Sequence, residues 1–177
     1  MRIFIALLFD EENKNIIHDI LQEVKVISKS GNFTDRNNLH LTLVYIGKTS
    51  DSELKNIRKK LSEINSQKFN YMTNKIKYFK KSNNQKIVYL GVDKTDSLLN
   101  LYNQVVTKLN ELEYDFLHEK LTPHITLGRK VVLKEYENIR SIYCNPLNLN
   151  AVKISIMESK RIDDKLVYEE LYNIPLI

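Results

Sequence analysis

Two short segments of the sequence repeat a histidine and a threonine at the same spacing. His40 precedes Thr42 by two positions, and His124 precedes Thr126 in the same way. An aliphatic residue stands inside each pair, a leucine follows each threonine, and close to half of the chain lies between the two histidines. One such motif says little, because a histidine in a half-buried strand usually has a structural role. Two copies in matching halves indicate a paired functional site.

These residue types suit the cleavage of a phosphodiester. Histidine titrates near neutral pH, so one imidazole can accept a proton from an attacking water while the other donates a proton to the leaving oxygen. The hydroxyls of Thr42 and Thr126 can donate hydrogen bonds to the non-bridging phosphate oxygens. The two motifs are nearly symmetric, so the residues themselves leave the donor and acceptor roles open. We expect no metal and no other cofactor.

Strand geometry explains the spacing of the motifs. Side chains in a strand alternate between its two faces, so His40 and Thr42 share one face and their aliphatic neighbours share the other. His124 and Thr126 follow the same rule. If the two halves are related by a pseudo-twofold axis, the polar faces oppose each other and the aliphatic residues pack into the core.

Hydrophobic periodicity predicts the elements that position the motifs. The predicted helices cover residues 16–27, 50–64 and 98–112, with a short helix at 134–142. The predicted strands cover residues 2–9, 39–47, 68–80, 86–93, 121–130, 147–158 and 166–174. Ser50 and Glu53 form a capping-box pattern at the start of the second helix. The polar segment 28–38 is predicted as a loop, and the order of elements indicates an α+β fold with mostly antiparallel strands.

Composition is typical of a globular protein with one body. Hydrophobic residues make up 42% of the chain and charged residues 28%. Only four glycines and three prolines are present, so no linker divides the chain, and we expect a single domain over residues 1–177. The longest apolar run, at the N-terminus, is too short for a membrane span or a signal segment, which predicts a cytoplasmic protein. The lone Cys144 excludes an intrachain disulfide and a cysteine-based zinc site.

The charge balance points weakly towards an anionic partner such as nucleic acid. The chain has 27 basic and 22 acidic residues, a formal net charge of +5. A lysine-rich solvated surface would give the same balance. No long apolar stripe remains for a partner subunit, so we expect a monomer.

Several blocks of the sequence resemble the 2H phosphoesterase superfamily and, within it, the RNA 2′,3′-cyclic phosphodiesterases that are also called 2′-5′ RNA ligases. The resemblance covers nearly the whole chain, and the two motif blocks, near residues 38–47 and 122–130, are its most specific part. The matching blocks are Met1–Leu7, Asn37–Gly47, Pro123–Arg129 and Met157–Arg161 followed by Tyr168.

This resemblance implies a fold of two pseudo-symmetric lobes that exchange strands around a V-shaped cleft. It also implies the opening of a 2′,3′-cyclic phosphate at an RNA end, which leaves a 2′-phosphate. In that reaction His40 would donate a proton to the 3′ leaving oxygen and His124 would accept a proton from water. The ligase name reflects the reverse reaction on 2′-5′ linkages, and hydrolysis should dominate in water.

Four other residues are candidates for the site. Phe33 stands where many members of the family have tryptophan, and it could stack on a base or anchor its loop in the core, the second being favoured. Arg129 follows the second motif, but strict alternation turns it away from the histidine of that motif unless the strand bulges. Lys48 has the parity of His40 at the end of its strand. His118 could add a third zinc ligand, although nothing in its spacing supports a metal site.

Two alternative functions remain open. A non-catalytic RNA-binding module would use the same polar faces and would bind RNA in a salt-sensitive way without turnover. A phosphodiesterase acting on 2′-5′ oligonucleotides or on small cyclic nucleotides would use the same chemistry on another substrate. RNA ends and cyclic nucleotides are therefore the expected substrates, and the walls of the site decide between them.

Overall fold

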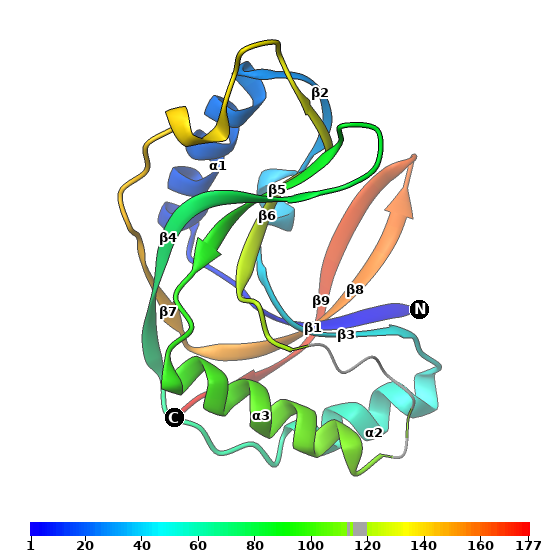
Figure 1. The fold of residues 1–177 in the computed structure, drawn as a ribbon. Coiled ribbons are helices and arrows are strands. Elements are labelled where there is room, and N and C mark those ends of the chain that lie inside the picture. The colour runs from blue at the N-terminus through cyan, green and yellow to red at the C-terminus, as the bar shows by residue number, and fades with distance from the viewer. Residues whose placement is uncertain (113, 115–119) are drawn as a thin grey trace.

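The computed structural model describes residues 1–112, 114 and 120–177 (Figure 1). Its elements, in chain order, are β1 (Arg2–Leu7), α1 (Glu11–Val26), β2 (Ser28–Phe33), η1 (Arg36–Asn38), β3 (Leu41–Lys48), α2 (Asp51–Leu61), β4 (Phe69–Lys80), β5 (Lys86–Val92), α3 (Asp96–Asn110), β6 (His124–Leu133), η2 (Ile139–Ser141), β7 (Asn148–Ala151), β8 (Lys153–Ile162) and β9 (Lys165–Pro175).

The strands form two sheets, and each sheet takes strands from both halves of the chain. One sheet has the order β3-β1-β8-β9, and the other has the order β2-β6-β5-β4-β7. Every pairing between these strands is antiparallel. The α+β prediction with mostly antiparallel strands is therefore confirmed.

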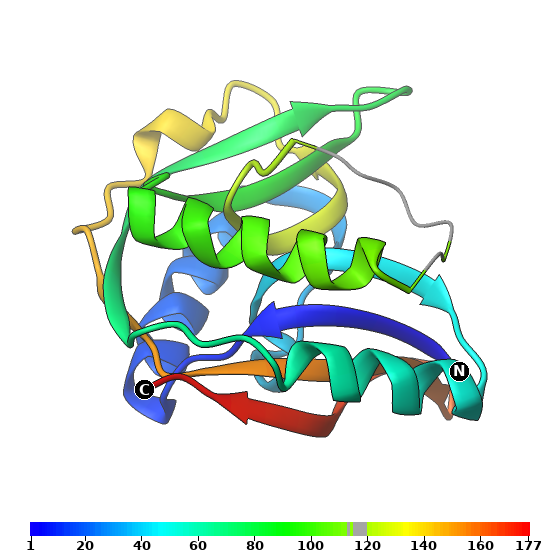
Figure 2. The same ribbon diagram turned by 90° about the horizontal axis from the view of Figure 1, so that it is seen from below.

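Side-chain caps start the three longer helices. Asp10, Ser50 and Thr95 each accept a hydrogen bond from a backbone N–H in the first turn of α1, α2 and α3, and Ser50 forms the predicted capping box with Glu53. In both ribbon views α2 and α3 lie side by side, with α1 apart from them (Figures 1 and 2). None of the helices in the described part of the chain is long and apolar enough to cross a bilayer.

Strand β1 is buried on both faces, as its continuous apolar run predicts. Ile3, Ile5 and Leu7 belong to the main core, whereas Phe4 and Ala6 belong to a small second cluster. The second cluster also contains Met157 of β8, with Leu8 and Tyr168 packed against it. The ring of Phe4 in this second cluster contacts the ring of His40. The second cluster and His40 therefore lie on the same face of the four-stranded sheet.

Three predictions of local structure were wrong. The segment 28–38 contains β2 and η1 rather than a loop, because β2 is an edge strand held by backbone pairing to β6 and needs no apolar alternation. Only the three residues of η2 are helical within 134–142. The predicted strand 147–158 is two strands in different sheets, since β7 pairs with β4 and β8 pairs with β1 and β9.

Candidate active site

His40 lies directly before β3, with both ring nitrogens in hydrogen-bond contact. Its Nδ1 is 2.7 Å from the carbonyl oxygen of Asn38, and its Nε2 is 2.9 Å from Thr42 Oγ1. A carbonyl can only accept, so Nδ1 holds the hydrogen and Nε2 is the reactive atom of the neutral ring. The His-x-Thr spacing therefore places the threonine hydroxyl on the nitrogen that would exchange a proton.

His124 begins β6 in the same local geometry. Its Nδ1 is 2.7 Å from the carbonyl oxygen of Thr122, two residues before it, as Asn38 stands two residues before His40. The repeated contact fixes the same tautomer in both rings, with Nε2 as the proton-accepting atom of each neutral imidazole.

Burial follows the alternation that the sequence predicts. Leu41 and Ile125, which stand between each histidine and its threonine, have no exposed surface, and Leu39 and Leu127 are also buried. Both histidines and both threonines are half-buried. The aliphatic residues thus hold the strands to the core while the polar pairs face away from it.

Backbone contacts bring the two motifs together from different sheets. Strands β3 and β6 lie in contact. Thr34, in the segment that leads from β2 to η1, donates from its backbone N–H to Leu127 O at 2.9 Å and from Oγ1 to Thr126 O at 2.9 Å. The charge of Arg129, which follows the second motif, lowers the pKa of the His40 imidazole. The two motifs therefore lie near each other and make up the candidate site.

The surroundings of His40 disfavour its protonated form. Burial is the largest cause, the hydrogen bond to the Asn38 carbonyl opposes it, and electrostatic repulsion from the second motif and Arg129 adds to it; together they lower the pKa of His40 to about 4. At neutral pH His40 is therefore an uncharged imidazole in this structure.

Aromatic rings and one buried amide position His40. Its ring centroid is 4.9 Å from that of Phe4 and 5.1 Å from that of Tyr168, the latter edge-on. The Asn38 side chain donates to Leu166 O at 2.8 Å and accepts from the backbone N–H of Tyr168 at 3.1 Å. Asn38 thus ties β9 to the first motif and holds Tyr168 against the imidazole.

His124 contacts a second pair of aromatic rings. Tyr89 lies 5.3 Å and Phe79 lies 5.8 Å from it between ring centroids, both nearly edge-on, and the two rings stack on each other at 4.4 Å. Across the sheet, Tyr89 of β5 pairs with Thr126 of β6 and with Lys77 of β4. Residues paired in register share a face, so an aromatic and cationic surface continues from the second motif.

A bulge in β6 brings Arg129 to the site. Tyr89 pairs with Thr126, but the preceding Val88 pairs with Gly128, so that Leu127 has no direct partner among the described residues of β5. Such an extra residue shifts the alternation of the strand after it. Accordingly, the charge of Arg129 lowers the pKa of His40 and that of Tyr168, although burial of the Tyr168 hydroxyl is the larger influence and raises its pKa.

The structure does not bring the other candidates to the histidines. Phe33 pairs with Gly128 and packs against the main core, so it anchors β2 in this structure. Lys48 pairs with Arg2 at the end of β3 that lies far from His40. His118 lies outside the described residues, and within the described ranges no three His, Cys, Asp or Glu residues gather as metal ligands.

Sequence reasoning missed most of the residues that surround the two imidazoles. Phe4, Asn38 and Tyr168 stand in blocks that show the family resemblance, but nothing local assigned them to His40. Tyr89 and Phe79 could have been found only from the register of β4, β5 and β6, which the sequence does not reveal.

Comparison with known proteins identifies the family of this chain. The model of the 2′-5′ RNA ligase superfamily matches residues 15–161. The chain belongs to the 2′-5′ RNA ligase superfamily. A superfamily relative from Thermotoga maritima, named RNA 2′,3′-cyclic phosphodiesterase, is 28% identical over 176 residues, which cover 97% of this chain and 94% of the relative. One from Archaeoglobus fulgidus with the same name is 30% identical over 130 residues, covering 73% and 72%.

A solved structure supports the fold assignment within the superfamily. The crystal structure of E. coli LigT in complex with 3′-AMP superposes with a TM-score of 0.78 at 20% identity, covering 99% of this chain and 97% of LigT. The resemblance to this superfamily that the motif blocks predicted is confirmed.

Proposed function

We propose that this protein hydrolyses 2′,3′-cyclic phosphodiester ends of RNA to 2′-phosphomonoesters, by metal-independent acid–base catalysis with His40 and His124. The observation on which this depends is the pair of His-x-Thr motifs, each with Nδ1 bonded to a carbonyl and Nε2 left for the reaction. The names of the two relatives and the 3′-AMP bound to LigT support a nucleotide phosphoester as the ligand.

The reaction needs one proton acceptor and one proton donor. Water attacks phosphorus while a neutral imidazole removes its proton, the bond from phosphorus to O3′ breaks, and the protonated imidazole delivers a proton to O3′. Thr42 and Thr126 donate hydrogen bonds to the non-bridging phosphate oxygens. The Arg129 guanidinium offsets the negative charge of these oxygens. The resemblance implies that His124 is the acceptor and His40 the donor, and we adopt these roles in the proposal.

A donor must be protonated, yet the pKa of His40 is lowered to about 4. The phosphodiester is an anion, and its charge beside His40 favours the imidazolium. We therefore propose that His40 takes up its proton on Nε2 when the substrate binds, and that the Thr42 hydroxyl then turns its hydrogen to the phosphate, which leaves Nε2–H for O3′. In the alternative, the roles are reversed and His40 is the base. The neutral state of His40 in the protein without substrate favours this alternative.

The decisive experiment replaces each histidine separately. We expect His40→Ala and His124→Ala each to lower kcat/KM on 2′,3′-cyclic AMP by about 10²–10⁴-fold, because each proton transfer is lost. His18→Ala, on α1 and outside the site, is the matched control and should keep wild-type activity. Activity should persist in EDTA.

Near-full turnover in either variant of the motif histidines would refute the mechanism. Salt-sensitive RNA binding without turnover of any cyclic phosphate would favour the non-catalytic RNA-binding module instead. Turnover of 2′-5′ linked oligonucleotides or small cyclic nucleotides in preference to RNA ends would keep the chemistry and change the substrate.

A further inference from the structure

The β4–β5 hairpin concentrates positive charge beside His124. Residues 69–92 include five lysines and no Asp or Glu, in a chain that has 22 acidic residues. Strand β7 pairs with β4 only over residues 69–72, so the second half of β4 pairs with β5 alone and forms an edge of the sheet. Lysines on an edge strand also prevent unwanted sheet pairing, but that role does not require the exposed aromatic rings found among them.

On the face of β4 that continues from the second motif, Lys77 and Phe79 project beside Tyr89. Phe79 stacks on Tyr89 with the ring planes 25° apart, lies edge-on to His124, and is 37% exposed. Lys77 is exposed and pairs in register with Tyr89. A flat, accessible ring and an exposed ammonium group thus adjoin the imidazole.

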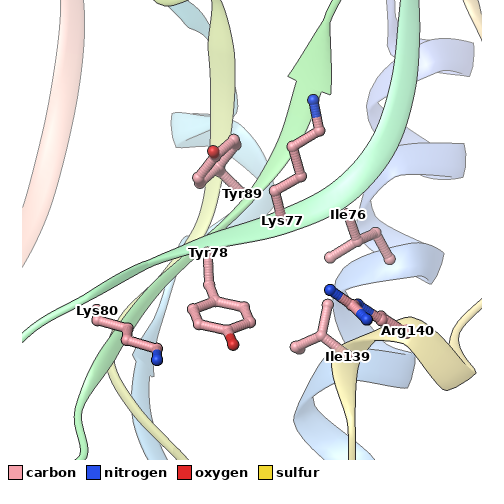
Figure 3. Close-up of a pocket in the computed structure, with 7 residues that line it drawn as sticks. All are labelled: Ile76, Lys77, Tyr78, Lys80, Tyr89, Ile139 and Arg140. Carbon is pink, nitrogen blue, oxygen red and sulfur yellow. The ribbon is translucent and has the colours of Figure 1, made fainter.

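The opposite face of the same edge has a similar combination. Tyr78, Lys80 and Arg140 of η2 line a hollow of about 480 Å³, and Lys77 and Tyr89 also line it. Figure 3 shows Lys77 and Tyr89 on one side of β4, with Tyr78, Lys80 and Arg140 on the other. The hollow therefore runs around the edge of β4 and connects the face beside His124 with the outer face.

Among the described residues, the cations of this edge have no acidic partners. No ion pair in the described part of the chain involves Lys77, Lys80 or Arg140, whereas Lys60 and Lys108 on the helices each contact two glutamates. Lys86 extends its ammonium over the Tyr78 ring, 5.4 Å from the centroid. Proteins that bind single-stranded nucleic acid usually have a surface on which such unpaired cations alternate with accessible aromatic rings. The cations bind phosphates and the rings stack on bases.

We propose that this edge, the β4 ridge (Lys77, Tyr78, Phe79, Lys80 and Arg140), binds the single-stranded RNA chain on the 5′ side of the reacting end. The proposal rests on the proposed function, because it places the cyclic phosphate at the two histidines. The nucleotides before it pass over the exposed Phe79 ring and around the edge of β4 into the hollow beside Arg140. The substrate class is then an RNA oligonucleotide rather than a cyclic mononucleotide.

The test compares two double variants that remove the same charge. Lys80→Gln/Arg140→Gln alters the ridge, and Lys55→Gln/Lys59→Gln alters exposed lysines of α2 as the control. We measure kcat/KM on 2′,3′-cyclic AMP and on a short oligoribonucleotide with a 2′,3′-cyclic phosphate. In the ridge variant, the ratio of kcat/KM on the oligonucleotide to kcat/KM on 2′,3′-cyclic AMP should fall about tenfold. In the control variant, the same ratio should stay within about twofold of wild type.

Binding gives the same comparison without turnover. A fluorescent oligoribonucleotide ending in a 2′-phosphate is titrated at several salt concentrations, and two lost phosphate contacts should reduce the slope of log Kd against log salt by about 1.4. Equal losses of oligoribonucleotide affinity in the ridge and control variants, or no loss in the ridge variant, would refute the proposal that the β4 ridge binds RNA. Ridge-dependent binding by a protein that turns over neither substrate would support the ridge and refute only the proposed catalysis.

Discussion

Two nearly identical motifs have different surroundings in the structure. His40 lies between the rings of Phe4 and Tyr168, whereas His124 lies beside the exposed ring of Phe79. Burial penalises the charged imidazole, so the pKa of His40 is lowered and its ring is neutral at neutral pH. This asymmetry is what a reaction with one donor and one acceptor requires.

Arg129 should control the protonation of His40. Its charge helps to lower the pKa of His40, so Arg129→Gln should raise that pKa, as followed by NMR titration of the imidazole. Lys130→Gln removes the same charge from the neighbouring residue and should leave the His40 titration unchanged. A shift of equal size in both variants would show only a general field effect.

The same titration tests the proposed role of His40. Adding 2′-AMP to the wild-type protein should raise the pKa of His40 above its value near 4, because the phosphate charge lies beside the ring. If His40 stays neutral with the nucleotide bound, it is the base and His124 is the donor.

Among the elements, β6 determines the geometry of the site through its irregular pairing. The register with β5 shifts next to Gly128, and Phe33 of β2 pairs with that same glycine from the other side. A Cβ on Gly128 would lie 2.9 Å from Val131 Cγ2 and 3.1 Å from the Phe33 ring. The bulge that delivers Arg129 therefore depends on a position with no side chain.

Gly128→Ala should accordingly destabilise the protein. We expect the free energy of unfolding to fall by about 1–3 kcal/mol, because the methyl group overpacks the contact between Val131 and Phe33. Urea unfolding followed by circular dichroism measures this. Ser30→Ala, at an exposed position of β2, should change stability by no more than about 0.5 kcal/mol, and a Gly128→Ala protein as stable as that control would contradict the overpacking.

For the whole molecule, the lowered pKa of His40 should make the folded protein less stable in acid. The pKa of His40 is about 4 in the folded protein against 6.5 for an unperturbed histidine, so the unfolded chain takes up this proton first. Stability from the neutral ring is complete above pH 6.5 and is lost as the pH falls from 6.5 towards 4. Acid should therefore weaken the fold through the same histidine that we propose for catalysis.

This linkage predicts a specific loss on acidification. Between pH 7 and pH 4.5, His40 should contribute about 2 kcal/mol to the fall in the free energy of unfolding. Urea titrations at both pH values should show a smaller fall for His40→Asn than for wild type, whereas His18→Asn should behave as wild type. Equal falls in all three proteins would show that His40 titrates normally.

The sequence by itself determined the two polar pairs and the faces on which they lie. Alternation in a strand is local, so His40 with Thr42 and His124 with Thr126 could be assigned to one face from spacing alone. The helices followed from their apolar periodicity and from caps such as Ser50. Strand β2 could not be predicted, because long-range backbone pairing holds its polar residues in place.

Tertiary structure decided what surrounds the motifs. Arg129 lies on the face of the second motif only because β6 bulges beside Gly128, and Tyr89 reaches His124 only through the register of β5 on β6. Pairing between strands far apart in the chain sets both register and bulges, and no local pattern encodes it. The sequence therefore determined which groups are the candidates for the chemistry, and the packing of the two sheets decided their neighbours and the protonation of His40.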